Sequence, residues 1–177
     1  MLSSFFSSSR PGQDVLQRLF ARAGRTPDAG PVAEVQLPDA AALAMVREPE
    51  SFGVIVTNNL FGDLLTELGA ALEGGLGMAA SANLNPGKLS MFEPIHGSAP
   101  ALAGCDEANP MGMILTAALM LDALGHPAEA RQIEDAVMRT VEAGEGTRDV
   151  GGTLGTRATG DAILARLREG SASTRDA

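Results

Sequence analysis

The chain has 177 residues, a length that suits one domain and is short for two. Hydrophobic residues make up 45% of it and charged residues 20%, which is typical of a globular protein. Its formal net charge of −9 argues against nucleic-acid binding, which requires Lys and Arg to neutralise phosphates. No apolar stretch is long enough to span a bilayer, and the single cysteine, Cys105, excludes an internal disulfide and fits a reducing cytoplasm.

The first fifty residues are predicted to begin with a leader and to continue as short helices and strands. Residues 1–12 are expected to be a disordered leader, because this Ser-rich start lacks the positive charge and the long apolar middle of a signal peptide. Asp39 precedes an Ala-rich run and is a candidate N-cap or first-turn acid of a helix. In chain order, the patterns predict a helix over residues 15–23, a turn over 25–31, a strand over 32–37 and a helix over 40–46.

A β-branched run and a leucine-rich segment form the next predicted strand and helix. Residues 54–57 are continuously β-branched, which is typical of a strand buried on both faces. Leucines then recur at helical spacing, so a helix is predicted over residues 60–72. A glycine cluster at residues 74–77 ends this helix.

The second half is predicted to be mainly helical around one long loop, residues 93–110, which contains three prolines and two glycines. Loops of this length in compact domains usually serve a function. Strands that alternate with helices indicate an α/β fold, and so few strands for so many helices indicate an incomplete sheet. The other predicted elements are a loop over residues 81–88, a strand over 89–92, helices over 111–124 and 127–143, a glycine loop over 151–155, a helix over 161–168 and a disordered tail over 169–177.

Two acids on the helix over residues 60–72 are candidate metal ligands. Asp63 and Glu67 are four residues apart and share one face of that helix, where two like charges repel each other. A hard divalent cation such as Mg²⁺ or Mn²⁺ would reverse that repulsion, because these ions prefer carboxylate oxygen. On spacing alone, two solvated acids on an exposed helix face are the commoner case.

The loop over residues 93–110 carries a second group of candidate residues. Gly97 would let a ligand approach the backbone closely, Ser98 and Asn109 offer hydrogen-bond donors and acceptors, and His96 could stack on or bond to a nucleotide. The alternative is a structural loop with a satisfied histidine, and the residues alone leave both interpretations open. The sequence contains neither a G-x-G-x-x-G fingerprint nor a Walker loop.

These segments resemble the isocitrate/isopropylmalate dehydrogenase family, most closely its isopropylmalate branch or its tartrate and D-malate branch. VIVTNNLFGDLL over residues 54–65 is similar to the family's metal-site segment, and MFEPIHGSAP over residues 91–100 to its cofactor loop. LGMAASAN over residues 76–83 resembles the stretch that links the two, and DVGGT over residues 149–153 the turn before the last helix. Several motifs in the family's order make this resemblance far more specific than any one motif.

The resemblance implies metal-dependent oxidation of a 2-hydroxy acid by NAD, followed in most members by decarboxylation. The family's metal-binding acids correspond to Asp39, Asp63 and Glu67, with Mg²⁺ or Mn²⁺ as the cation, although Glu67 departs from the usual Asp. The first of these acids reaches into the partner subunit's site in the family, so a homodimer is implied. 3-Isopropylmalate, and with it leucine biosynthesis, is the first expectation, and tartrate or D-malate the second.

The family's cofactor-binding residues correspond to Glu93, His96, Gly97, Ser98, Ala99 and Asn109. Ala101 departs from the family, because NAD-preferring relatives carry Asp there and NADP-preferring ones carry Lys, whose charge suits the 2′-phosphate. NAD is expected and NADP stays open, since the sequence reveals no cation for that phosphate. No catalytic residue is assigned, because the family's catalytic Lys would fall near Gly12 and the chain has no Tyr.

The resemblance covers the carboxy-terminal half of the family's chain, so a partial isopropylmalate-dehydrogenase-like fold with an incomplete sheet is expected. Residues 13–72 would be the end of the small dimerisation domain, with the metal ligands, and residues 73–168 the carboxy-terminal part of the large cofactor-binding domain. Three interpretations follow: a truncated enzyme without turnover of its own, a non-catalytic subunit that pairs with an intact paralogue, and a product that does not fold. A cytoplasmic protein without nucleic-acid or membrane partners is expected.

Overall fold

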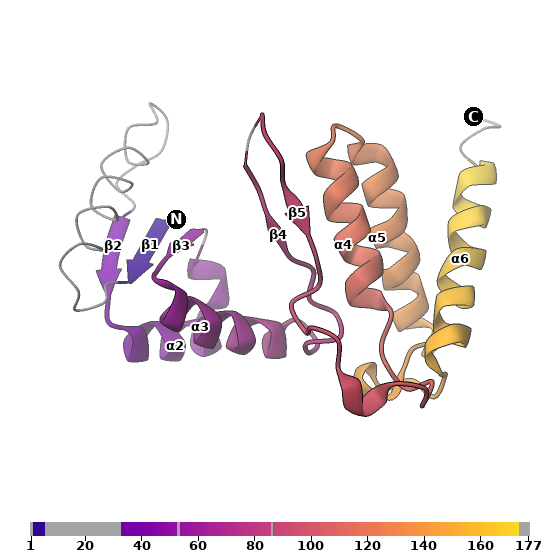
Figure 1. Cartoon of the computed structure of the whole chain (residues 1–177), viewed down its shortest axis with the longest axis horizontal. Helices are drawn as coiled ribbons and strands as arrows, with labels where there is room; N and C mark the ends of the chain where they lie inside the picture. The colour runs from indigo at the N-terminus through magenta and orange to yellow at the C-terminus, as the bar shows by residue number, and fades with distance from the viewer. Residues whose placement is uncertain (1, 6–32, 53, 86, 174–177) are drawn as a thin grey trace. The chain divides into compact units, whose positions relative to one another are not determined.

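The computed structural model describes residues 2–5, 33–52, 54–85 and 87–173 (Figure 1). The chain divides into two compact units, Met1–Leu72 and Glu73–Ala177, named here the sheet unit and the helical unit. The helix predicted over residues 15–23 and the turn predicted over residues 25–31 lie outside the described residues. In the described part, no helix is both long and apolar enough to cross a bilayer.

The sheet unit contains a parallel three-stranded sheet in the order β2-β1-β3 (Figure 1). Strand β1, Leu2–Phe5, is central and pairs with β2, Ala33–Gln36, on one side and with β3, Val54–Val56, on the other. The parallel pairing, together with the helix that connects β2 to β3, confirms the predicted α/β class.

Strand β1 corrects one prediction, since residues 2–5 were expected to belong to a disordered leader and form the middle of the sheet instead. Pairing to a strand on each side stabilises such a segment through long-range contacts that a local reading of its Ser-rich composition does not reveal. The rest of the predicted leader, residues 6–12, lies outside the described part of the chain.

The sheet unit also contains two described α-helices. Helix α2, Pro38–Arg47, begins with Pro at its first position, and Asp39 is an acid of its first turn, which confirms one of the two roles predicted for Asp39. Helix α3, Asn59–Leu72, begins after Asn58, whose Oδ1 accepts a hydrogen bond from the Phe61 backbone N at 3.1 Å. A short 3₁₀ turn, Pro49–Ser51, lies between α2 and β3.

The core of the sheet unit is small. Ala41 on α2 and Leu65 on α3 are buried, and partly buried apolar side chains, including Met45 and Ile55, pack against them. Strand β3 is less buried than predicted, because Val54 is 52% exposed and β3 forms one edge of the described sheet. The expectation that this strand is buried on both faces is therefore wrong for the described residues.

The helical unit consists of a short hairpin and three helices. Strands β4, Ala82–Asn83, and β5, Met91–Phe92, pair antiparallel, and β4 was predicted as loop. Helix α5, Pro127–Glu142, packs between α4, Met111–Ala123, and α6, Thr156–Ser173 (Figure 1). The remaining elements are two 3₁₀ turns, η2 (Pro100–Leu102) and η3 (Arg148–Val150).

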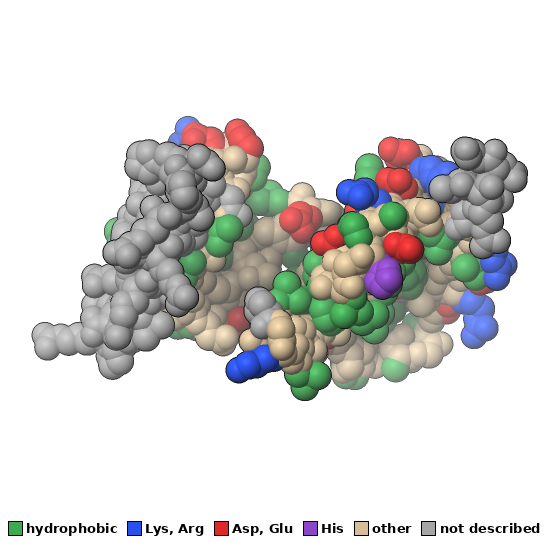
Figure 2. Space-filling view, turned by 90° about the horizontal axis from the view of Figure 1, so that it is seen from above, with side chains coloured by type: hydrophobic (Ala, Val, Ile, Leu, Met, Phe, Trp, Pro, Cys, Tyr) green, Lys and Arg blue, Asp and Glu red, His purple; other side chains and the backbone are tan. Residues whose placement is uncertain are grey.

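The core of the helical unit joins these helices around four buried residues. Met111, Ala136, Val137 and Ile163 are at most 3% exposed, and apolar side chains such as Met78 and Leu115 pack around them. Apolar side chains also reach the surface of this unit (Figure 2), and Leu89, which is 93% exposed, is an extreme example.

Candidate functional site

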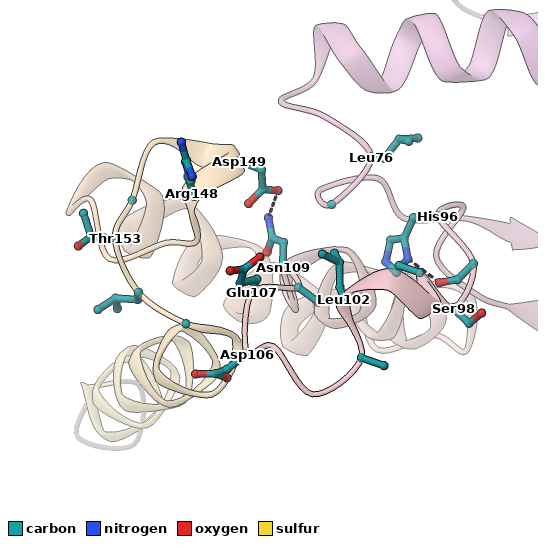
Figure 3. Close-up of a pocket in the computed structure, with 18 residues that line it drawn as sticks. Leu76, His96, Ser98, Leu102, Asp106, Glu107, Asn109, Arg148, Asp149 and Thr153 are labelled. Atoms are coloured by element: carbon teal, nitrogen blue, oxygen red, sulfur yellow. Dashed lines mark hydrogen bonds between the residues drawn. The ribbon is translucent and has the colours of Figure 1, made fainter.

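The helical unit contains a cavity of about 1190 Å³, somewhat larger than the roughly 300–1,000 Å³ usual for ligand-binding pockets (Figure 3). Three segments that are far apart in sequence line it: the turn at residues 76–77, the loop from residue 96 to residue 109, and the turn from residue 148 to residue 155. The cavity thus opens where the long predicted loop meets the glycine-rich turn that precedes α6.

Five of the six residues predicted to bind the cofactor line this cavity: His96, Gly97, Ser98, Ala99 and Asn109. Glu93 does not line the cavity; it is exposed just after β5, and its backbone N donates to the Ser81 oxygen at 3.2 Å. The structure therefore brings most of the predicted cofactor-binding residues together at the cavity and leaves Glu93 outside it.

The loop at residues 96–99 turns sharply into the cavity wall. Gly97 has a φ of +63°, and Ala99 has a φ of 40° with a ψ of 63°, a left-handed conformation that costs an alanine about 1 kcal/mol. His96 Nδ1 donates to the Gly97 oxygen at 2.8 Å, since a carbonyl can only accept, and this bond leaves Nε2 as the acceptor of the neutral ring. A Cβ at residue 97 would meet no atom within 4 Å, so the loop presents open backbone on that side.

The far end of the loop is anchored to the start of α6. Asp106, in a left-handed conformation with a φ of 56°, accepts from Thr156 N through its backbone oxygen at 2.9 Å and from Arg157 N through Oδ1 at 3.1 Å. Thr156 Oγ1 donates in turn to the Ala108 oxygen at 2.5 Å. Asp106 therefore caps a helix that begins about fifty residues later in the chain.

We expect Asp106→Ala to lower the free energy of unfolding by about 1 kcal/mol, because the first turn of α6 loses its side-chain acceptor. Asp106→Asn keeps an acceptor oxygen and tolerates the left-handed backbone, so it should cost less than half as much. Urea denaturation of the two variants measures the difference. Equal losses would show that the carboxamide oxygen does not replace the cap.

A hydrogen-bonded junction joins the loop to the turn after α5. Asn109 Nδ2 donates to Asp149 Oδ2 at 2.9 Å (Figure 3). Thr147 Oγ1 donates to Asp149 Oδ1 at 2.5 Å. Asn109 was predicted as a site residue, whereas Asp149 was matched only as part of a turn and Thr147 was not singled out. The bond between Asn109 and Asp149 connects residues forty positions apart, so no local pattern in the sequence indicates it.

The charged residues of the cavity are mostly acidic. Asp106, Glu107 and Asp149 line it, and Arg148 is the single Lys or Arg among the described lining residues. Arg148 was not predicted as a cavity residue. The family resemblance placed the coenzyme-selecting side chain at Ala101, and Arg148 lies 47 positions later in the chain.

The three predicted metal ligands lie in the sheet unit and are exposed. Asp39 Oδ1 accepts from the adjacent Ala40 N at 2.9 Å, and Asp63 Oδ2 accepts from Asn59 Nδ2 at 3.0 Å. Within the described residues, no three His, Cys, Asp or Glu side chains gather as a metal site would require. Asp63 and Glu67 remain a pair of hard oxygen donors on one helix, a donor set that suits Mg²⁺ or Mn²⁺, and the full site stays a prediction.

Comparison with known proteins gives consistent matches. The family model described as isocitrate/isopropylmalate dehydrogenase matches residues 21–163. A 3-isopropylmalate dehydrogenase of Corynebacterium jeikeium is 50% identical over 132 residues, and a probable tartrate dehydrogenase/decarboxylase of Bacillus subtilis is 50% identical over 133 residues. These matches cover 73% and 74% of this chain, which spans 38% of the length of each relative.

A solved structure agrees with these sequence matches. The isocitrate dehydrogenase of Methylococcus capsulatus superimposes with a TM-score of 0.81 at 36% identity. The match covers 94% of this chain and 50% of that structure, so the described fold corresponds to part of a larger one.

Proposed function

Because this chain belongs to the isocitrate/isopropylmalate dehydrogenase family, we propose that it forms the cofactor-binding and metal-binding part of a decarboxylating 2-hydroxy-acid dehydrogenase. The observation that carries this proposal is the cavity in the helical unit, lined by five of the six residues expected to bind the cofactor. The names of the two relatives support a small 2-hydroxy acid as substrate. 3-Isopropylmalate, a step of leucine biosynthesis, is the first candidate, and tartrate or D-malate the second.

The cavity residues have distinct roles in this proposal. The open backbone at Gly97 and the hydroxyl of Ser98 would let a nicotinamide dinucleotide lie against the loop, and the half-buried amide of Asn109 would offer it a hydrogen-bond donor. His96 is fixed through Nδ1 and would present Nε2 as an acceptor. When bound, NAD would accept a hydride and the divalent cation would polarise the substrate oxygen as a Lewis acid.

The sheet unit would contribute the metal ligands and a surface for association. Asp63 and Glu67 would hold Mg²⁺ or Mn²⁺ together with substrate oxygens, and Asp39 would complete the site in a dimer. Leu60, Leu64 and Leu72 on α3 recur at helical spacing and are 48% to 66% exposed, which supports pairing with a second copy or with an intact paralogue. A cytoplasmic location is also proposed, supported by the free thiol at Cys105.

The chain as it stands would bind cofactor without turning over substrate. It has no Tyr, and Lys88 is its single Lys, so neither general acid–base group of the family has a counterpart. Two measurements on the purified full chain test the proposal: calorimetry with NAD, and the absorbance of NADH in the presence of 3-isopropylmalate and Mg²⁺. Binding without NADH formation is expected. A cooperatively folded chain that does not bind NAD would contradict the proposed cofactor site.

The coenzyme preference is expected to favour NAD, with NADP as the alternative that Arg148 supports. Three acids against one base make the cavity unfavourable for an added phosphate, so 5′-AMP should bind roughly fivefold more tightly than 2′,5′-ADP, which differs from it by the 2′-phosphate alone. Arg148→Gln should widen that ratio. Calorimetry with the two nucleotides measures it, and tighter binding of 2′,5′-ADP would indicate that Arg148 outweighs the acids and selects NADP.

A further inference from the structure

Asp149 connects two walls of the cavity through a single side chain. Its Oδ2 accepts from Asn109 Nδ2 at 2.9 Å (Figure 3). Its Oδ1 accepts from Thr147 Oγ1 at 2.5 Å, so both carboxylate oxygens are engaged. Thr147 is fully buried, and its hydroxyl therefore needs an acceptor inside the protein. The buried Thr147 hydroxyl therefore anchors one oxygen of the Asp149 side chain.

Asn109 is constrained on both sides of its amide. Its Oδ1 accepts from the Met111 backbone N at 2.9 Å, at the start of α4, while one Nδ2 hydrogen is donated to Asp149. A backbone N–H can only donate and a carboxylate can only accept, so these two partners assign the oxygen and the nitrogen of the amide without ambiguity. The second Nδ2 hydrogen has no partner among the described residues, and Asn109 lines the cavity.

Gly77 closes the third side of this junction. A Cβ at residue 77 would lie 2.5 Å from Asp149 Oδ2 and 2.8 Å from Asn109 Cβ, distances that real Cβ contacts do not show. The Gly77 oxygen also accepts from Gly112 N at 2.8 Å, which ties the turn to α4. The Asn109–Asp149 pair therefore packs directly against the Gly77 backbone, which leaves no room for a side chain on that side.

We propose that Asp149 is a positioning residue of the cofactor site: it fixes the Asn109 amide so that one N–H faces the cavity and binds an acceptor atom of the nucleotide. The inference rests on the proposed function and goes beyond it, because it gives a role to a residue that the family resemblance matched only as part of a turn. The ligand atom is a ring nitrogen or an oxygen that can accept a hydrogen bond.

The test compares nucleotide affinity in the full chain by calorimetry with 5′-AMP and with NAD. Asp149→Ala is expected to weaken both by about tenfold, the value of roughly one well-placed hydrogen bond. Asp149→Asn keeps an oxygen that accepts from Asn109, so it should restore affinity to within about twofold of the wild type. Its amide can only donate to Thr147 Oγ1, so the buried hydroxyl loses its acceptor and the variant should lose stability instead.

A double-mutant cycle separates positioning from a direct contact. If Asp149 acts through Asn109, Asp149→Ala should have no further effect on affinity in a chain that already carries Asn109→Ala, whereas additive losses would overturn the inference. Ile163→Val is the matched control, since it weakens the buried core of the same unit away from the cavity. It should lower the melting temperature and leave the affinity unchanged.

A second measurement does not depend on the folding of any Asp149 variant. In the wild-type chain, the two Asn109 side-chain amide protons should give separate NMR signals, and one of them should shift when 5′-AMP is added. No shift in a chain that binds 5′-AMP would overturn the inference alone. Failure of the wild-type chain to bind either nucleotide would overturn the proposed function and the inference together.

Discussion

Gly152→Ala is expected to lower the free energy of unfolding of the helical unit by about 3 kcal/mol. A Cβ added at residue 152 would lie 2.7 Å from the backbone N of Gly146 and still closer to its carbonyl carbon and oxygen. These neighbours are backbone atoms, which cannot rotate away as a flexible side chain can. Gly152 N also donates to the Thr147 oxygen and Leu154 N to the Gly146 oxygen, at 3.0 and 2.9 Å, so the turn must break hydrogen bonds to make room.

Gly160→Ala is the matched control for this prediction. Gly160 lies inside α6, and a Cβ there would meet no atom within 4 Å, so the substitution should raise the free energy of unfolding by about 1 kcal/mol through helix propensity. Urea denaturation followed by circular dichroism measures both variants. If Gly152→Ala proved as well tolerated as Gly160→Ala, the close approach of Gly146 and Gly152 would be refuted.

The double variant Asp63→Asn, Glu67→Gln is expected to bind Mn²⁺ at least about tenfold more weakly than the wild-type chain. The two carboxylates are the hard donors that one face of α3 offers, and Asn and Gln replace an anionic oxygen by a neutral one. In the absence of metal the same double variant should be slightly more stable, since it removes a repulsion between like charges four residues apart on a helix. Titration calorimetry with Mn²⁺ and thermal denaturation measure the two effects.

Two single variants sharpen the metal prediction. Glu67→Asp restores the residue that the resemblance leads us to expect, and it should bind Mn²⁺ at least as tightly as the wild type. Glu50→Gln removes an exposed acid of the same unit that is not a predicted ligand, and it should leave the affinity unchanged. Mn²⁺ binding that survives in the double variant would assign the metal to other residues.

Helices with strong periodicity and clear stop signals were predictable from the sequence. The expected boundaries of α3, α4 and α5 lie within one residue of those observed, because leucine spacing, Pro110 and Pro127, and glycines after each helix mark them locally. Helix α6 was predicted over residues 161–168 and runs from Thr156 to Ser173. Its true start is set by Asp106, a cap that lies about fifty residues away and leaves no sign at the start of the helix itself.

The candidate site was predictable on one side only. The loop over residues 93–110 stands out through its prolines, glycines and polar side chains, and five of the six predicted residues line the cavity. The opposite wall contains Gly77, Arg148 and Asp149, which reach the cavity only through the fold. The short strand β4 was missed for the same reason, because two residues form a strand only through pairing with β5.

The anchoring of the loop to residues 147–157 has a consequence for the order of folding during synthesis. Its hydrogen bonds join residues 40 to 51 positions apart, so the cavity cannot form completely until residue 157 has left the ribosome. A nucleotide would then stabilise only molecules in which this late step is complete, and would protect them selectively from proteases that attack unfinished chains.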